Sequence, residues 1–421
     1  MEKLCIIGGG ITGIFSALSL SLDGYDVTLF ERNSLLSGTS GRFHGMLHSG
    51  SRYSVNDPKS AKECINENKL LSKQASRFIK NTGGYFVALN SDEEEYGDKL
   101  LKSNIKNGIE SEEMDVNDFL KIEPNINKKI RRVIKVPDKT IAAHNFSAAI
   151  ALEAVMAGAK IKTSCNIIGA NISEKNVRTI KYEYNGDIIN KNFDYIINTT
   201  GPWSGKLLNS FGINNFDIMP TLGYMAVYNR LFVNSIINRM RLPSDGDIAL
   251  PYGTGTVIGT LAIISDDPDQ NNVDSDDIDM MISEISEMIP SLSNYNYKKL
   301  YYSMRPLIKG ESSRGSRDFQ IIKNFDNMIS VIGGKFTTTR LMAENVSKKI
   351  NQLYGNKNYD TKKIDFNSTF ERYIDKYKST IDKEFIDYIR SYNDGMDYNY
   401  SDYILSAYLL NNAIKRCRNG F

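Results

Sequence analysis

A glycine-rich turn between a short apolar run and a helical pattern constrains the fold of this chain more than any other feature. Leu4–Ile7 is an apolar strand candidate that leads directly into Gly8-Gly9-Gly10-Ile11-Thr12-Gly13. Apolar residues then recur at helical spacing, and the run Asp26–Phe30 alternates as a second strand before Glu31. This order predicts a βαβ unit, the opening of a doubly wound parallel sheet.

The three glycines of this turn suit a dinucleotide. Glycine allows the tight turn and the close backbone approach that a pyrophosphate needs, and the N-terminus of the following helix presents N–H groups to it. Glu31 can accept hydrogen bonds from the ribose hydroxyls. A packing turn with incidental glycines is the alternative, but the flanking strand and helix favour the nucleotide.

The composition excludes several classes of protein. The chain has 421 residues, and 52 Lys and Arg against 50 Asp and Glu leave a net charge of +2, which argues against nucleic-acid binding. The four cysteines form no C-x-x-C pair, so we expect free thiols and no metal site. No segment has the pattern of a signal peptide or a membrane span. We therefore expect a cytoplasmic protein, with peripheral attachment to a membrane left open.

The rest of the chain predicts a discontinuous nucleotide domain. Phe193–Asn198 and Met328–Ile332 are fully apolar, as parallel strands covered on both faces are. Between them, Leu222–Tyr228, Ile248–Pro251 and Thr256–Ile264 look like antiparallel strands. The prediction is an α/β fold in which a Rossmann-like domain (residues 1–84, 140–215 and 300–355) holds an inserted mixed or antiparallel sheet domain (85–139 and 216–299), followed by two or three surface helices (356–421).

A second glycine-rich segment, Ser37–Tyr53, carries candidate reactive groups. Its small residues let the backbone lie against a cofactor, and His44 and His48 are two of the three histidines in the chain. An isolated histidine is more often structural, but His48 lies in a glycine-rich loop beside Arg52 and Tyr53. We therefore favour a functional role for His48 and leave both interpretations open for His44.

Three basic segments near the end of the last parallel strand indicate an anion site. They contain Arg305, Arg317 and Lys335. Guanidinium groups grip phosphate oxygens in a bidentate way, and Lys335 is expected at a helix N-terminus. Solvated surface charge is the alternative, and it fits Arg305 poorly because apolar residues flank it.

Together these segments resemble the FAD-dependent glycerol-3-phosphate dehydrogenases of the amino-acid-oxidase-like flavoprotein superfamily. The resemblance is greatest to the catalytic subunit of the anaerobic enzyme and runs from Lys3 to about Ile350. Beside the motifs above, it rests on Val136-Pro137-Asp138, Thr200-Gly201-Pro202-Trp203, Ile258-Gly259-Thr260 and Gly333–Arg340.

The resemblance implies noncovalent FAD and the oxidation of sn-glycerol 3-phosphate to dihydroxyacetone phosphate, with hydride transfer from C2 to the flavin. His48 would be the catalytic base, because imidazole titrates near neutral pH. Arg52, Tyr53, Arg305, Arg317 and Lys335 would bind the substrate. The expected cofactor-binding residues are Gly8, Gly10, Ile11, Thr12, Gly13, Glu31, Arg32, Thr39, Ser40, Gly41, His44, Gly45, Met46, Leu47, Ile167, Thr200, Gly201, Trp203, Arg305, Gly334, Lys335, Phe336 and Thr337.

Two alternatives stay open. The substrate could be another small anion, such as a 2-hydroxy acid or an amino acid, since a carboxylate can use the same arginines. The chain could also be a non-catalytic flavin-binding subunit that relays electrons. The segment Ala142-Ala143-His144, which differs from the pattern of the family, fits this alternative. Cys417 alone cannot form the cysteine cluster associated with the anaerobic enzyme. The electron acceptor (quinone, oxygen or a partner protein) and the oligomeric state are not determined by the sequence.

Overall fold

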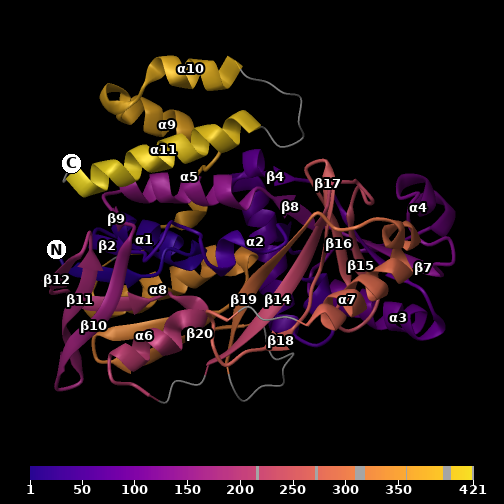
Figure 1. Cartoon of the computed structure of the whole chain (residues 1–421), viewed down its shortest axis with the longest axis horizontal. Helices are drawn as coiled ribbons and strands as arrows, with labels where there is room; N and C mark the ends of the chain where they lie inside the picture. Colours follow the sequence, from indigo (N-terminus) through magenta and orange to yellow (C-terminus); the bar gives the residue numbers. More distant parts are fainter. Residues whose placement is uncertain (215–217, 271–273, 309–317, 357, 392–399, 420–421) are drawn as a thin grey trace.

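The computed structural model describes residues 1–214, 218–270, 274–308, 318–356, 358–391 and 400–419. Figure 1 shows two sheet-containing halves side by side, with a layer of helices over one of them. The half that carries the N-terminus is built on a six-stranded sheet in the order β20-β21-β13-β1-β2-β9. These strands are β1 (Lys3–Ile7), β2 (Asp26–Phe30), β9 (Lys160–Lys162), β13 (Tyr195–Asn198), β20 (Phe319–Phe325) and β21 (Met328–Gly333).

Both faces of this sheet are covered, which explains its apolar strands. On one face, Leu4 and Ile6 belong to the same buried core as residues of α1 (Ile11–Leu22), α5 (Ala143–Met156) and α8 (Thr339–Tyr354). On the other, Cys5 and Ile7 pack with residues of a three-stranded meander and α6. These elements are β10 (Cys165–Ser173), β11 (Asn176–Tyr184), β12 (Asp187–Lys191) and α6 (Ser204–Ser210). The predicted parallel core is confirmed, with β20 as an antiparallel edge strand.

The second half is a mixed sheet, as predicted. Its order is β18-β14-β17-β16-β15-β5-β7-β6, and β19 pairs with β14 off this path. Only β5 and β15 pair in parallel among its described strands. The strands are β5 (Gly84–Ala88), β6 (Glu112–Met114), β7 (Arg132–Val136), β14 (Ile218–Tyr228), β15 (Ile236–Arg239), β16 (Ile248–Tyr252), β17 (Gly255–Gly259), β18 (Ile263–Ile264) and β19 (Lys299–Ile308), with helices α3 (Ser91–Lys106), α4 (Val116–Ile122) and α7 (Ser275–Met288).

Two details differ from the sequence expectation. The single strand expected over residues 256–264 is two strands, because the chain leaves the sheet after Gly259 and rejoins β14 at Ile263. We propose to keep the expected domain division with one shift: β19 pairs with β14 along its whole length, so residues 299–308 go with the mixed sheet.

Three short strands, a helix and two single turns join the halves. They are the strands β3 (Met46–Leu47), β4 (Ile79–Lys80) and β8 (Lys139–Ile141), the helix α2 (Pro58–Gln74), and the single turns η2 (Ser51–Tyr53) and η4 (Gly201–Trp203). The small sheet β3-β8-β4 lies where the chain passes between the halves.

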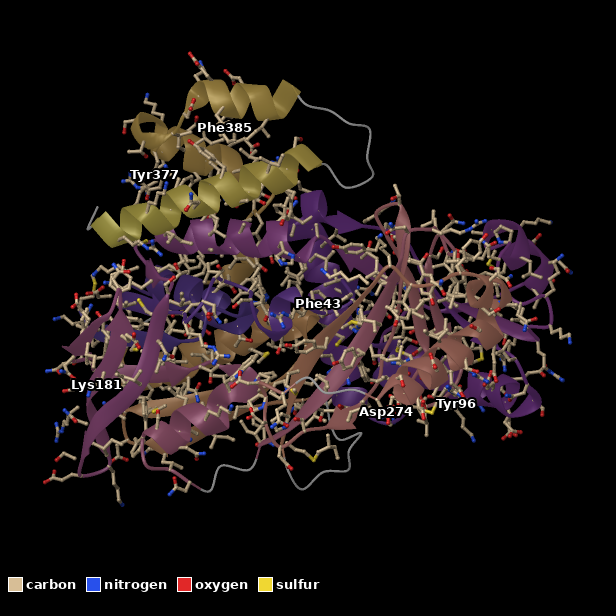
Figure 2. All side chains as sticks on the ribbon, in the orientation of Figure 1. Phe43, Tyr96, Lys181, Asp274, Tyr377 and Phe385 are labelled. Carbon is tan, nitrogen blue, oxygen red and sulfur yellow. The ribbon has the colours of Figure 1, made fainter. Side chains whose placement is uncertain are left out.

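The last helices form a layer outside α5 (Figure 1). They are α9 (Thr369–Lys376), α10 (Lys383–Ser391) and α11 (Tyr400–Asn419), and Figure 2 shows Tyr377 and Phe385 in this layer. Leu405, Leu409 and Ala413 of α11 are buried in the same core as α1 and α5. This layer is therefore part of the core as well as of the surface. No helix in the described part of the chain is both long enough and apolar enough to cross a membrane.

Candidate cofactor and substrate site

The glycine-rich turn after β1 needs glycine for steric reasons. Gly8 has φ +113°, and a Cβ there would lie 2.7 Å from the carbonyl oxygen of Thr199. A Cβ on Gly13 would collide with the carbonyl oxygen of Gly8, so α1 can approach β1 closely only because that Cβ is missing. The turn is thus shaped for close backbone contact, as the sequence predicts.

The end of β2 and the start of α1 form a site for a ribose and a pyrophosphate. The carboxylate of Glu31 accepts hydrogen bonds from the N–H groups of Gly9 (2.7 Å) and Asn33 (2.8 Å), which fix its position beside the turn. Gly10 provides no side-chain cap to α1, while Ser40 Oγ accepts from the N–H of Ile11 at 3.0 Å. Other N–H groups of the first turn can therefore face an anion.

One cavity of about 1150 Å³ extends from this turn to the mixed sheet. Most of the expected site residues line it: Gly8, Gly10, Ile11, Thr12, Glu31, Arg32, Thr39, Ser40, His44, Met46, His48, Arg52, Tyr53, Ile167, Thr200, Gly201, Trp203, Arg305, Gly334, Lys335 and Phe336.

Five expected cofactor-binding residues lie behind the cavity wall. Leu47 is fully buried in the core, and Gly13 packs on the glycine turn. Gly41 packs against the backbone of Leu36, the carbonyl of Gly45 accepts from the N–H of Ile141, and the Oγ1 of Thr337 accepts from the N–H of His48. These residues are not among those that line the cavity, and their expected contact with the cofactor stays a prediction.

His48, Tyr53, His44 and Lys335 form one group, which we call the His48 cluster. The side chain of His48 is largely buried, and the rings of His44 and Tyr53 both have their centroids 5.5 Å from it. Lys335 Nζ lies 4.5 Å from the centre of the Tyr53 ring. The N–H of Met46 donates to Nδ1 of His44 at 3.2 Å, which leaves the proton of a neutral His44 on Nε2. Sequence positions far apart thus supply an imidazole, a phenol and an ammonium to one place.

Arg305 enters the same cavity from β19. Its Nη1 donates to the carbonyl oxygen of Leu261 at 2.9 Å. The guanidinium lies over Gly223 of the neighbouring strand β14, where any Cβ would collide with it. Gly223 therefore leaves the space that this cation occupies.

Arg52 lines the cavity but is already engaged. Its Nη2 forms a buried ion pair with Asp247 at 3.0 Å. Arg317, the other expected substrate ligand, lies outside the described residues, so its predicted role stays a prediction.

One part of the wall was not among the expected site residues. The segments around Leu242–Ile248 and Thr260–Asp269 of the mixed sheet also line the cavity. Apart from β18, Thr260 of the Ile258-Gly259-Thr260 motif and the first residue of β16, they are loops without a characteristic spacing, and the pairing of the sheet brings them to the cavity.

A small network closes the outer wall between the two halves. Asp269, from the loop between β18 and α7, accepts from Trp203 Nε1 (2.6 Å), Arg32 Nη2 (3.2 Å) and Lys206 Nζ (2.6 Å). The Arg32 guanidinium also lies over the Trp203 ring at 4.8 Å. Burial alone would raise the pKa of Asp269, but these three donors lower it to about 2.

These observations fit FAD. The glycine turn would receive the pyrophosphate and Glu31 the ribose, and a cavity of this volume is large enough for a dinucleotide. Among the described residues, no group of three or more His, Cys, Asp or Glu side chains could hold a metal ion.

Comparison with known proteins agrees with this geometry. The model of a family described as FAD dependent oxidoreductase matches residues 3–348. The chain belongs to this family. It is 34% identical over 375 residues to a subunit of the anaerobic glycerol-3-phosphate dehydrogenase of Haloferax volcanii (84% of this chain, 64% of the relative). It is 31% identical over 371 residues to a subunit of the anaerobic glycerol-3-phosphate dehydrogenase of Escherichia coli (84% of this chain, 68% of the relative).

Within the FAD dependent oxidoreductases, the chain thus belongs with these anaerobic dehydrogenase subunits, of which it spans about two thirds of the length. A solved structure, an L-alpha-glycerophosphate oxidase from Mycoplasma pneumoniae with FAD bound, superposes with a TM-score of 0.70. It shares 20% identity, and the match covers 87% of this chain and 98% of that one. This likeness confirms the fold.

Proposed function

We propose that the chain oxidises sn-glycerol 3-phosphate to dihydroxyacetone phosphate with FAD. The observation that carries the proposal is the His48 cluster, which places a buried imidazole beside a phenol and an ammonium in the cavity that fits FAD. The names of the relatives support this choice of substrate over other small anions.

Different residues of the chain bind the substrate and accept its proton. Bound FAD supplies a ring that accepts a hydride. Lys335 and Arg305 bind the phosphate dianion through charge-assisted hydrogen bonds, and this fixes the position of the C2 carbon. His48 Nε2 or Nδ1 accepts the proton of the C2 hydroxyl, because a neutral imidazole is basic enough at neutral pH. Burial of His48 keeps bulk water away from this transfer.

Substrate identity is tested by flavin bleaching without oxygen. Glycerol 3-phosphate should bleach the absorbance of the bound flavin rapidly, glycerol only slowly and at high concentration, and 2-hydroxyglutarate and amino acids not at all. If 2-hydroxyglutarate or an amino acid bleached the flavin and glycerol 3-phosphate did not, the proposed substrate would be wrong. A yellow protein that no candidate bleaches would support the electron-relay alternative.

Arg305→Ala tests the phosphate contact. Loss of a charged hydrogen-bond partner should raise the KM for glycerol 3-phosphate about 10- to 100-fold. A slow reaction with glycerol at high concentration serves as the control and should change little, since glycerol has no phosphate. Equal losses for both substrates would contradict the assignment.

We further propose that electrons leave to a quinone or a partner protein. The names of the relatives call them subunits, which supports a partner. Turnover with a quinone analogue should exceed turnover with oxygen, and lipid vesicles test a peripheral membrane contact. A cytoplasmic location stays a prediction of the sequence.

A further inference from the structure

We propose that Asp247 is a positioning residue for the His48 cluster. By holding the guanidinium of Arg52, it fixes the turn that carries Tyr53 against His48 and Lys335. The inference rests on the proposed function, because the His48 cluster is the expected binding point of the substrate. It differs from the sequence expectation that Arg52 itself contacts the substrate.

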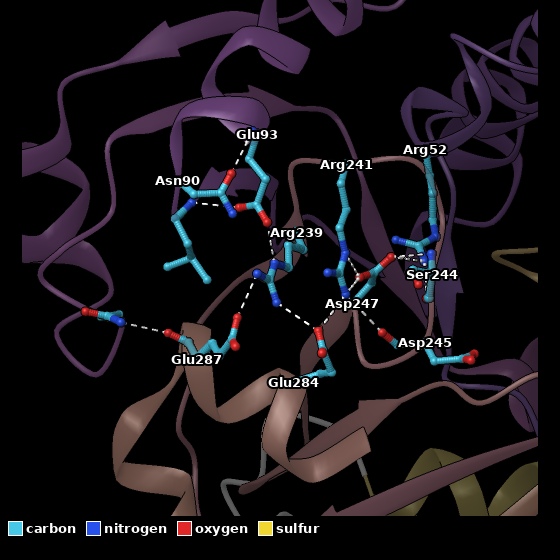
Figure 3. Close-up of polar contacts among 12 residues, drawn as sticks. Arg52, Asn90, Glu93, Arg239, Arg241, Ser244, Asp245, Asp247, Glu284 and Glu287 are labelled. Carbon is cyan, nitrogen blue, oxygen red and sulfur yellow. Dashed lines mark hydrogen bonds and ion pairs between the residues drawn. The ribbon is translucent and has the colours of Figure 1, made fainter. Parts of the chain in front are cut away.

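Asp247 is the centre of a buried set of contacts at the start of β16 (Figure 3). Its side chain has no exposed surface. Oδ2 accepts from Arg52 Nη2 at 3.0 Å and from the N–H of Ser244 at 2.5 Å, and Oδ1 accepts from Arg241 Nε at 2.8 Å. Both carboxylate oxygens are therefore engaged, and the position of Asp247 is fixed from three directions.

Arg52 is held by this carboxylate on one side. Nη2 also donates to the carbonyl oxygen of Ser244 at 3.3 Å. Nη1 is buried, and it has no hydrogen-bond partner among the residues that the structure describes. The charge of Arg52 is thus compensated by Asp247, and Nη2 is held on the side of the mixed sheet while Arg52 still lines the cavity. This ion pair ties the turn that carries Arg52 to the mixed sheet.

The contact between Arg52 and Asp247 acts on a segment whose start is already held in place. The N–H of His48 donates to Thr337 Oγ1, and the N–H of Ser49 donates to Asp138 Oδ1 at 2.6 Å. Arg52 adds the link from η2 to strand β16 of the mixed sheet. Tyr53 is the next residue, so the orientation of its ring toward Lys335 depends on where η2 is held.

The rest of the network leads away from the cavity and offers a matched control. Arg241 also pairs with Glu284, and Glu284 pairs with Arg239. Arg239 Nε meets Glu93 Oε1 at 2.6 Å, and both of these side chains are 6% exposed. Figure 3 shows this pair at the far side of the network from Arg52. It is as buried as the Arg52–Asp247 pair but touches neither η2 nor the cavity.

The decisive comparison is Asp247→Asn against Glu93→Gln in the FAD-loaded protein. Anaerobic stopped-flow bleaching over a range of glycerol 3-phosphate concentrations gives both a Kd and a limiting rate. Asp247→Asn should raise the Kd about tenfold or more, with a smaller fall in the limiting rate, as loss of a group that orients a site residue does. Glu93→Gln should lower the melting temperature similarly and leave the Kd unchanged.

The sign of the effect separates this role from simple charge compensation. If Asp247 only neutralised Arg52, its removal would leave more positive charge near the cavity and strengthen anion binding. An unchanged or lower Kd in Asp247→Asn would therefore overturn the proposal, and so would an equal rise in Glu93→Gln. Inorganic phosphate, used as a competitor, should also bind more weakly to Asp247→Asn than to the unaltered protein or to Glu93→Gln.

Asp247→Glu keeps the ion pair and guards against misfolding of the first variant. Its longer side chain displaces Arg52 without removing charge, so a raised Kd supports positioning and an unchanged Kd overturns it. If glycerol 3-phosphate does not bleach the unaltered protein, the proposed function fails. If it bleaches the unaltered protein and the variants keep its Kd, only the inference about Asp247 fails.

Discussion

Asp138 shows how the tertiary structure changes the chemistry of a single residue. Its side chain is buried, and Oδ1 accepts from the N–H of Ser49, the residue after His48. Burial raises the pKa of Asp138 from 3.8 to about 6, although the hydrogen bonds from Ser49 and the charge of Arg52 oppose the rise. The side chain of Asp138 thus changes between neutral acid and carboxylate at a pH of about 6. It does so in contact with Ser49, which follows the expected base His48 in the chain.

Asp138→Asn should remove a pH dependence of stability. Between pH 3.8 and about 6 the folded state binds a proton that the unfolded state has lost, so the free energy of unfolding falls as the pH rises. The asparagine variant does not titrate, so its stability lacks this fall with rising pH. Its amide oxygen can still accept the hydrogen bond from the Ser49 N–H. Urea unfolding at pH 4 to 7 should show the variant gaining stability relative to the unaltered protein as the pH rises. A constant difference would contradict the assignment.

His48→Asn should separate catalysis from binding. The rate of flavin bleaching by glycerol 3-phosphate should fall by about 10²–10⁴ if His48 is the base. Thr337 bonds the backbone N–H of residue 48, so that contact should survive the change. Stopped-flow absorbance gives the rate, and a flavin content equal to that of the unaltered protein is the control. An unchanged rate would remove His48 from this role.

At the scale of elements, Asp269 after β18 links the two halves at the outer wall of the cavity. Asp269 belongs to the mixed-sheet half, while Arg32, Trp203 and Lys206 belong to the nucleotide half. Because the pKa of Asp269 is lowered, its ion pairs stabilise the folded state fully above the ordinary pKa of an aspartate. This stabilisation is lost only as the pH falls through about 2. This contact is therefore fully charged under ordinary conditions.

Asp269→Asn should weaken the retention of FAD. Each partly exposed ion pair contributes only about 0.2–1 kcal/mol, so the two pairs together should change the FAD dissociation rate about 2- to 30-fold. The recovery of free-flavin fluorescence after dilution measures this rate, and high salt should reduce the difference. Asp118→Asn, which breaks an exposed ion pair on α4, is the matched control. Equal dissociation from both variants would show that Asp269 does not retain FAD.

At the scale of the whole molecule, the helical layer of α9, α10 and α11 shares its core with the nucleotide half. Leu409 of α11 is fully buried in the cluster that contains Phe15 and Phe146. The apolar spacing of this polar segment predicts two or three surface helices, and the structure shows that their apolar side packs into the core. The stability of the FAD-binding half therefore depends on residues far along the chain from the glycine turn.

Leu409→Ala tests this dependence. Removing the side chain should lower the free energy of unfolding by about 2–5 kcal/mol. Because the core is continuous, flavin release and loss of helical signal should occur in the same transition. Two separate transitions, with FAD retained after the first, would show that the layer is independent. Leu353→Ala, at an exposed position of α8, should change stability little.

The sequence by itself determined those features of the fold that depend on interactions between residues close together in the chain. The glycine turn, the apolar strands beside it and Glu31 follow from steric and hydrogen-bonding needs within a few residues, and the structure confirms this βαβ opening. The doubly covered strands were predictable for the same reason, since a strand buried on both faces must be apolar throughout.

Only the tertiary structure decided which charged residues are available to a ligand. Arg340 and Lys335 lie in one conspicuous basic segment, yet Arg340 is buried in an ion pair with Glu67 of α2, whereas Lys335 reaches Tyr53 in the cavity. Arg52 lines the cavity as the sequence predicts, but its ion pair with Asp247, far along the chain, appears only in the structure. The partner of a charge is set by long-range packing of strands and helices, and no local pattern contains it.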